Sequence, residues 1–246
     1  NKMEENIVTI SQSELNGEVF ITGAKNAVLI HLVTTLLTDK EVVIENYPNN
    51  MLDVLVQEEM LTYLGKKIYK GAGGISISGS VVSSDLIWEK RSIRNTLLVL
   101  GALLTKTGSG KVPLPGGCPL GDRKYDIHIG LMKAMGAKVW QEDMYLCAKV
   151  DGRLHGCEYV LPIRSTGATE NAILMASIAQ GVTKIWNPHI RPEILDLICL
   201  LQKMGAKIKV NGQESITIEG AKKLEGNVCH FGLSDNFQAL TFISSG

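Results

Sequence analysis

The chain has 246 residues, an apolar fraction of 45% and a formal net charge of zero, with 25 Lys and Arg residues against 25 Asp and Glu residues. This composition supplies a large core and excludes a disordered chain. A neutral chain without a block of Lys and Arg does not favour nucleic acid as a partner. The polar first 16 residues do not resemble a signal peptide, and the apolar run 96–104 is too short to cross a membrane.

Five cysteines, at positions 118, 147, 157, 199 and 229, form no CxxC pair. Their odd number and scattered spacing argue against a disulfide framework and against a zinc site. Because free thiols suit a reducing compartment, we expect a cytoplasmic protein.

A pattern of about 70 residues repeats along the chain. The segments 64–68, 135–139 and 204–208 each read Leu or Met, Gly, Lys or Ala, Lys, then Ile or Val. In each case the glycine ends a segment of helical spacing, and a β-rich stretch follows. The sequence therefore predicts helices over 53–63, 127–134 and 192–203, each followed by a hairpin-like pair of strands over 68–78, 139–150 and 208–219.

Each unit also contains an earlier apolar helix, opened by Lys25-Asn26, Arg94-Asn95 and Glu170-Asn171. The shared asparagines are typical of N-terminal helix groups. We predict an α/β (α+β) fold of three βαβαββ repeats, with the apolar helices buried on most sides. The repeats are expected over about 21–80, 85–155 and 157–226.

A fourth repeat begins near the end of the chain. Ser234-Asp235-Asn236 precedes an apolar segment in the helix-opening position, and Gly246 falls part-way through the unit. We therefore expect a domain over 21–230, the start of a further repeat over 231–246, and a second half that is truncated or absent.

Residues 113–128 form the most distinctive stretch, because their counterparts in the other repeats, 47–50 and 187–190, contain no thiol and no double glycine. Cys118 lies among three glycines and three prolines, which predicts a shaped loop. Charged and titratable side chains follow within ten residues: Arg123, Lys124, Asp126 and His128. A thiol near cations can have a lowered pKa and act as an acid or nucleophile, whereas a thiol kept for packing more often lies in a hydrophobic run.

Lys25 and Arg94 lie at predicted helix N-termini, where they are candidates for anion binding or else solvated surface charges. The segment 164–169, with its small hydroxyl residues and glycine, is either an ordinary N-cap or a cradle for a diphosphate. Asp126 and His128 are a candidate acid and base, although residues two apart on a helix need not face each other. The remaining histidines show no motif spacing and are interpreted as structural or surface residues: His31, His155, His189 and His230.

The segments Gly23-Ala24-Lys25-Asn26-Ala27 and Leu114-Pro115-Gly116-Gly117-Cys118, with Arg123, Asp126 and His128 after them, resemble the UDP-N-acetylglucosamine 1-carboxyvinyltransferases, a family of enolpyruvyl transferases. Further similar stretches, 152–154, 165–169, 204–206 and 216–220, extend the resemblance in order over nearly the whole chain.

The resemblance implies an inside-out α/β barrel of two domains, each with three βαβαββ units. It implies transfer of enolpyruvate from phosphoenolpyruvate to the 3′-hydroxyl of UDP-N-acetylglucosamine, the first committed step of peptidoglycan synthesis. It implies no metal and no organic cofactor. The second domain would supply an aspartate base and further arginines, and residues 1–20 would pack on it.

The resemblance also implies roles for individual residues. Cys118 would protonate or covalently hold the enolpyruvyl group and would be alkylated by fosfomycin. Lys25 and Arg123 would bind phosphoenolpyruvate, with Asn26 at the junction of sugar and phosphate and Arg94 helping to hold the substrates. The uridine diphosphate would be lined by Arg123, Lys124, Tyr125, Asp126, Ile127, Ser165, Thr166 and Gly167.

The chain departs from the family pattern at Lys124, where a proline is usual, and at Asn236, where an arginine is usual. Members of the family are also nearly twice as long. Two alternatives therefore stay open: a half-length, non-catalytic homologue that binds a nucleotide sugar or a partner protein, and the sister enzyme of the shikimate pathway, against which Cys118 argues.

Overall fold

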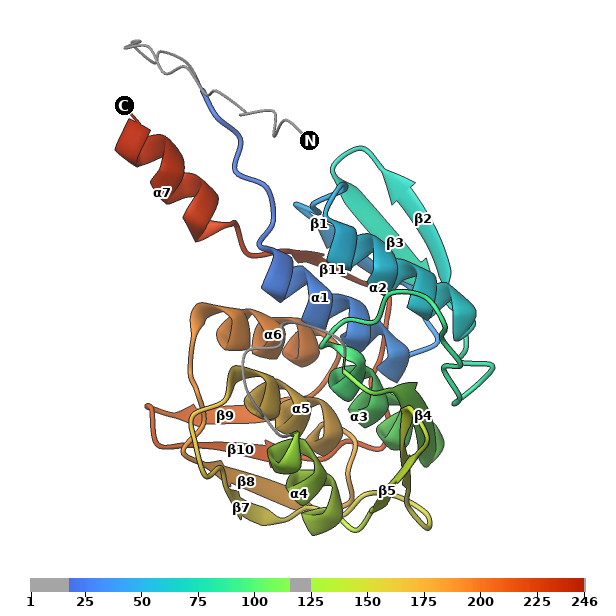
Figure 1. The fold of residues 1–246 in the computed structure, drawn as a ribbon. Helices are drawn as coiled ribbons and strands as arrows, with labels where there is room; N and C mark the ends of the chain where they lie inside the picture. Colours follow the sequence, from blue (N-terminus) through green and yellow to red (C-terminus); the bar gives the residue numbers. More distant parts are fainter. Residues whose placement is uncertain (1–17, 116–124, 246) are drawn as a thin grey trace, which may run out of the picture.

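The computed structural model describes residues 18–115 and 125–245. Helices alternate with short strands along the chain (Figure 1). The helices are α1 (Lys25–Thr34), the 3-10 turn η1 (Thr35–Leu37), α2 (Leu52–Tyr63), α3 (Thr96–Thr107), α4 (Asp126–Ala134), α5 (Thr166–Ala176), α6 (Pro192–Lys203) and α7 (Asn236–Ser245). The strands are β1 (Val42–Glu45), β2 (Lys67–Gly71), β3 (Gly74–Ser78), β4 (Ser109–Pro113), β5 (Lys138–Glu142), β6 (Tyr145–Lys149), β7 (Glu158–Val160), β8 (Val182–Trp186), β9 (Lys207–Asn211), β10 (Ser215–Glu219) and β11 (Val228–Phe231).

The strands form three small sheets with one common order. In each sheet a hairpin pairs antiparallel with the strand that precedes it, giving β1-β3-β2, β4-β6-β5 and β8-β10-β9. A parallel neighbour then lies on the outer edge: β11 beside β1, β7 beside β8, and a single bridge from Asp85 to Lys111 beside β4. Strand β11, from the end of the third unit, therefore completes the sheet of the first unit and closes the arrangement.

The helices fall into an inner and an outer set. Helices α1, α3 and α5 lie in the centre of the molecule, and the three sheets surround them (Figure 1). Consistent with this position, every residue from 27 to 34, from 96 to 104 and from 168 to 176 is buried. Helices α2, α4 and α6 each keep an exposed face. The fold is thus an α/β barrel with its helices inside, and the expected fold class is confirmed.

Most local expectations are confirmed, since the outer helices and the three hairpins lie within one residue of the predicted ranges. The prediction that Glu170-Asn171 opens a helix is wrong, because α5 begins four residues earlier at Thr166. Ser165 caps this helix by accepting a hydrogen bond from the Ala168 backbone N–H at 3.2 Å. Glu170 and Asn171 consequently lie in the helix interior and are buried.

The asparagines instead connect the inner helices. Asn95 Nδ2 donates to the Leu29 carbonyl of α1 at 3.3 Å, and Asn171 Nδ2 donates to the Leu97 carbonyl of α3 at 3.2 Å. Gly101 makes room for Asn171, because a Cβ at this position would lie 1.9 Å from Asn171 Oδ1. The expectation that Asn95 and Asn171 serve their own helix N-termini is therefore wrong for their side chains.

Within the described residues, no helix is both long enough and apolar enough to span a membrane.

Candidate functional site

Ion pairs link the N-terminal ends of α1 and α2 to the segment before α3, and we call this region the linked helix ends. Lys25, the first residue of α1, places its Nζ 3.1 Å from Asp53 Oδ2 in the first turn of α2. The other oxygen of Asp53 lies 3.6 Å from the guanidinium of Arg91, in the segment that leads into α3. All three side chains are at least partly exposed. Asp53 therefore offsets the unfavourable interaction of a cation with a helix N-terminus and holds Lys25 at this end of the molecule.

His128, in the first turn of α4, contacts α5 at Asn171 and lies beside the first turn of α5 at Gly167. Its Nδ1 lies 3.0 Å from Asn171 Nδ2, and its ring is 3.6 Å from the position that a Cβ on Gly167 would occupy. Burial and the nearby positive charge of Arg94 lower the pKa of His128 to about 4. The imidazole is therefore neutral at pH 7, with Nδ1 accepting from the amide of Asn171 and the proton on Nε2.

The start of α5 is held by the loop before α6. Thr166 Oγ1 lies 2.9 Å from His189 Nδ1, and the His189 backbone N–H donates to Thr169 Oγ1 at 3.0 Å. Ser165 accounts for one backbone N–H of the first turn. Ser165 is therefore an N-cap, as one interpretation of the segment 164–169 predicts, and the other interpretation, a cradle for a diphosphate, stays a prediction.

Glu170 is a buried acid one turn into α5. Burial, followed by the negative charge of Glu193 on α6, raises its pKa to about 8, while Arg191 acts in the opposite direction. The carboxyl group is therefore protonated at neutral pH.

The structure brings together several of the predicted site residues and leaves others outside its described range. Lys25, Asn26, Arg94 and Asp126 are exposed, and Tyr125 and Ile127 are half-buried against the core. His128 contacts Asn171 and not Asp126 in the described hydrogen bonds. Cys118, Arg123 and Lys124 lie outside the described residues, so their roles stay predictions.

Sequence reasoning missed Glu170 as a buried acid and His189 as a partner of Thr166. A carboxylate within an otherwise apolar helix was a usable signal for Glu170. No local signal identified His189, because its contact with Thr166 forms between segments 23 residues apart.

The arrangement suits the binding of anions. The linked helix ends carry the backbone N–H groups of helix N-termini and three cations, Lys25, Arg91 and Arg94. Helix N-termini favour phosphate and carboxylate groups through free N–H donors and the helix dipole. The fold and this site define an α/β barrel protein with a candidate site for anionic ligands.

The comparison with protein families then identifies the chain. The model of the EPSP synthase (3-phosphoshikimate 1-carboxyvinyltransferase) family matches residues 10–246, and the chain belongs to this family. UDP-N-acetylglucosamine 1-carboxyvinyltransferase of Prochlorococcus marinus (strain AS9601) is 39% identical over 244 residues, which cover 97% of this chain and 53% of that protein. UDP-N-acetylglucosamine 1-carboxyvinyltransferase 1 of Symbiobacterium thermophilum is 37% identical over 254 residues, covering 99% of this chain and 56% of the relative.

Solved structures support the fold. The enolpyruvyl transferase NikO from Streptomyces tendae superimposes with a TM-score of 0.76 at 22% identity, covering 93% of this chain and 54% of that one. EPSP synthase from Acinetobacter baumannii gives a TM-score of 0.71 at 20% identity, covering 92% and 52%. The predicted resemblance to enolpyruvyl transferases is confirmed. The chain spans about half the length of the curated relatives that it matches.

Proposed function

We propose that the chain carries the catalytic loop of a UDP-N-acetylglucosamine 1-carboxyvinyltransferase. In this reaction the 3′-oxygen of UDP-N-acetylglucosamine forms a bond to C2 of phosphoenolpyruvate, and the bond from C2 to the phosphate oxygen breaks with release of phosphate. The observation that carries the proposal is 36–39% identity over at least 93% of the chain to curated relatives of that name. The anion-binding end of the helices is consistent with two anionic substrates.

Lys25 binds the phosphate or carboxylate of phosphoenolpyruvate, in competition with its ion pair to Asp53. Asn26 and Arg94 contact the substrates beside it. The first turn of α5 contacts the diphosphate through the N–H groups of Thr166 and Gly167, which donate in none of the hydrogen bonds between described residues. Cys118 protonates or holds the enolpyruvyl group, and Arg123 binds phosphoenolpyruvate. The remaining lining of the uridine diphosphate is assigned to residues 124–127.

Binding measurements test the substrate. Calorimetry with UDP-N-acetylglucosamine is expected to give saturable binding, whereas shikimate 3-phosphate is expected to give none. Preference for shikimate 3-phosphate would assign the chain to the sister reaction, and saturable binding of neither would contradict the proposal. Lys25→Met is expected to weaken phosphoenolpyruvate binding about 10- to 100-fold through loss of a charge-assisted contact. Lys209→Met, on the exposed side of β9, is the matched control.

Labelling by fosfomycin tests the thiol. We expect the label on Cys118 and not on the other four cysteines, and loss of label in Cys118→Ser. Burial raises the pKa of Cys147 and Cys157, and partial desolvation together with the negative charge of Glu45 raises the pKa of the exposed Cys229, which makes these thiols poor nucleophiles at neutral pH. A label on Cys147 or Cys229 would count against the assignment.

Turnover tests the contribution of groups beyond this chain. We propose that a second domain or second chain supplies the base for the sugar hydroxyl and further arginines. This chain alone is then expected to release no detectable phosphate with both substrates. Robust phosphate release would overturn that part of the proposal but leave the substrate assignment intact, and substrate binding without turnover by any longer form would favour the non-catalytic alternative.

A further inference from the structure

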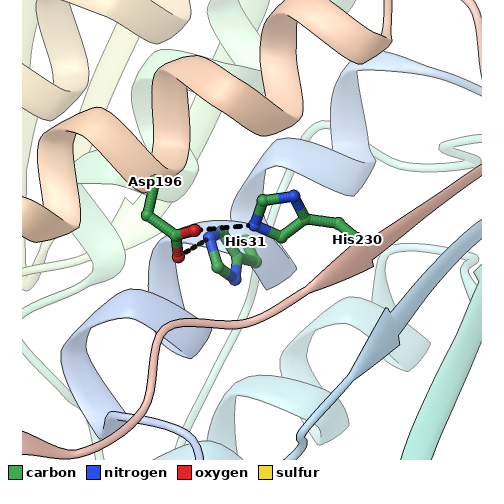
Figure 2. Close-up of side chains that lie close together, drawn as sticks. All are labelled: His31, Asp196 and His230. Atoms are coloured by element: carbon green, nitrogen blue, oxygen red, sulfur yellow. Dashed lines mark hydrogen bonds and ion pairs between the residues drawn. The ribbon is translucent and has the colours of Figure 1, made fainter.

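A cluster of three side chains, none of which belongs to the candidate substrate site, lies where α1, α6 and β11 meet. His31 Nε2 lies 2.9 Å from Asp196 Oδ2, and His230 Nε2 lies 2.9 Å from Asp196 Oδ1 (Figure 2). The two imidazole rings meet edge to face, with centroids 4.8 Å apart. Three elements distant in the sequence therefore direct two imidazoles and one carboxylate at a common point.

The hydrogen bonding of this cluster is incomplete. The side chain of His31 is fully buried and that of His230 is 3% exposed. Within the described residues, Nδ1 of His31 and Nδ1 of His230 have no hydrogen-bond partner, and Nε2 of His31, although 2.9 Å from Asp196 Oδ2, lacks hydrogen-bond geometry. Buried polar atoms are rarely left unpaired, and of these three nitrogens His31 Nε2 is the one that faces Asp196, where a ligand shared with the carboxylate would lie (Figure 2).

The negative charge of Asp196 is also not fully balanced by its neighbours. A carboxylate with only 12% of its side chain exposed is stabilised by a compensating charge, and the ion pairs described for Asp196 are with His31 and His230 alone. Neutral imidazole with an ionised carboxylate is the form in which these side chains bind metals.

We propose that His31, Asp196 and His230 bind one divalent ion of the zinc class, independently of the proposed transferase function. Each residue can offer one ligand atom such that the three atoms lie within 4.8 Å of one another. Zinc bonds of about 2.0–2.2 Å place neighbouring ligand atoms roughly 3.0–3.6 Å apart, so a small rotation of one imidazole closes the site. Two nitrogens and one oxygen suit zinc and its divalent neighbours better than calcium or magnesium, which prefer oxygen alone.

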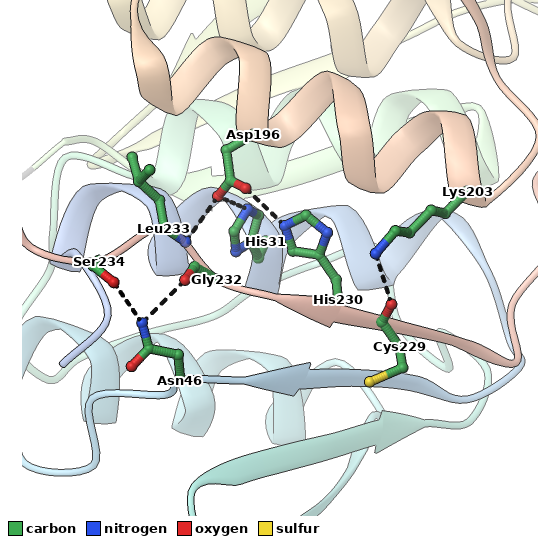
Figure 3. A network of polar contacts seen from close by, with 9 residues as sticks. All are labelled: His31, Asn46, Asp196, Lys203, Cys229, His230, Gly232, Leu233 and Ser234. Atoms are coloured by element: carbon green, nitrogen blue, oxygen red, sulfur yellow. Dashed lines mark hydrogen bonds and ion pairs between the residues drawn. The ribbon is translucent and has the colours of Figure 1, made fainter. Parts of the chain in front are cut away.

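Cys229 does not join this ligand set. Its side chain is exposed on the opposite face of β11, since successive residues of a strand point to opposite sides (Figure 3). Asp196 keeps an exposed fraction of 12%, which gives an ion and a bound water access to the site.

The ion would hold the segment that joins β11 to α7. The Leu233 backbone N–H already donates to Asp196 Oδ2 at 3.2 Å. Asn46 Nδ2 donates to the Gly232 carbonyl at 3.1 Å and to Ser234 Oγ at 3.2 Å from the other side (Figure 3). A metal on Asp196 would therefore connect two helices and the exit strand at one point.

Metal titration of chelator-treated protein tests the proposal. Calorimetry with Zn²⁺ is expected to show one equivalent per chain, and Co²⁺ is expected to give the visible absorption of a site with mixed nitrogen and oxygen ligands. Asp196→Asn, which keeps the shape but not the charge of the carboxylate, is expected to weaken Zn²⁺ binding at least 100-fold. His155→Ala, an exposed histidine outside the cluster, is the control and is expected to leave binding unchanged.

If Asp196→Asn does not fold, His31→Gln provides the second variant, with folding checked by circular dichroism before titration. Absence of stoichiometric uptake by the native protein would overturn the proposal and leave the cluster as a hydrogen-bonded network. Uptake that persists unchanged in a folded variant of His31 or Asp196 would also overturn it, because the ion would then bind elsewhere.

Discussion

Glu170 and Asp196 are acids on the neighbouring helices α5 and α6, yet their surroundings affect their ionisation in opposite ways. Burial and the charge of Glu193 raise the pKa of Glu170 to about 8. Burial also raises the pKa of Asp196, but the contacts with His230 and His31 outweigh it and bring the pKa well below its usual range. Burial alone therefore does not decide the charge of a carboxyl group. The hydrogen-bond donors and charges around it also determine its pKa.

The largest effect is expected from Asp196→Ala. Removal of the carboxylate leaves His31 and His230 buried and the Leu233 N–H without its acceptor. Leaving a buried donor without its acceptor costs about 1–3 kcal/mol, and since both the His230 ring and the Leu233 N–H lose theirs, we expect the free energy of unfolding in urea to fall by about 2–5 kcal/mol. Asp151→Ala, at an exposed position, is the control. A fall of less than about 1 kcal/mol in the free energy of unfolding would show that the contacts of the Asp196 carboxylate add little to stability.

Glu170→Gln is expected to stabilise the protein, by about 2–4 kcal/mol at pH 8.5 and much less at pH 5. The pKa of Glu170 in the folded chain, about 8, lies above its ordinary value of 4.5. The folded chain therefore binds more protons than the unfolded chain between these pH values, and its stability falls as the pH rises through them. Urea unfolding at pH 5, 7 and 8.5 checks this. The prediction is contradicted if the free energy of unfolding changes with pH in the same way for the native protein and for Glu170→Gln.

The third effect concerns His128, whose pKa of about 4 in the folded chain lies below the ordinary 6.5. The unfolded chain binds more protons between these values, so stability is lost as the pH falls from 6.5 to 4, by about 2 kcal/mol. His128→Gln, which retains an acceptor for Asn171, is expected to remove this part of the pH dependence. A proton NMR titration of the imidazole with a midpoint above pH 6 would refute the assignment.

The smallest effect is expected from Glu193→Gln. The charge of Glu193 is the second cause of the raised pKa of Glu170, after burial. Removing it is expected to lower that pKa by less than one unit, worth about 1 kcal/mol in the pH dependence of stability. Glu158→Gln, on the exposed face of β7, is the control. A pKa that returned to its ordinary value would make Glu193, and not burial, the main cause.

Particular residues show how far the sequence could predict the candidate site. Lys25 and Arg94 were found because a cation beside a predicted helix N-terminus is a local pattern, and the structure places both at the linked helix ends. For His31, His189 and His230 the sequence indicates structural or surface roles, since each is isolated in its own segment. Their partners Asp196 and Thr166 lie on other elements, and only the packing of the chain brings them together.

The sequence by itself determined the repeating helices and hairpins of this protein. Hydrophobic spacing and helix-ending glycines such as Gly65, Gly136 and Gly205 act over a few residues, so the neighbouring sequence is enough to predict their effect. The tertiary structure alone decided that Glu170 is neutral while Asp196 is charged. The reason is physical, because the desolvation and the hydrogen-bond partners that set a group's pKa come from elements far apart along the chain.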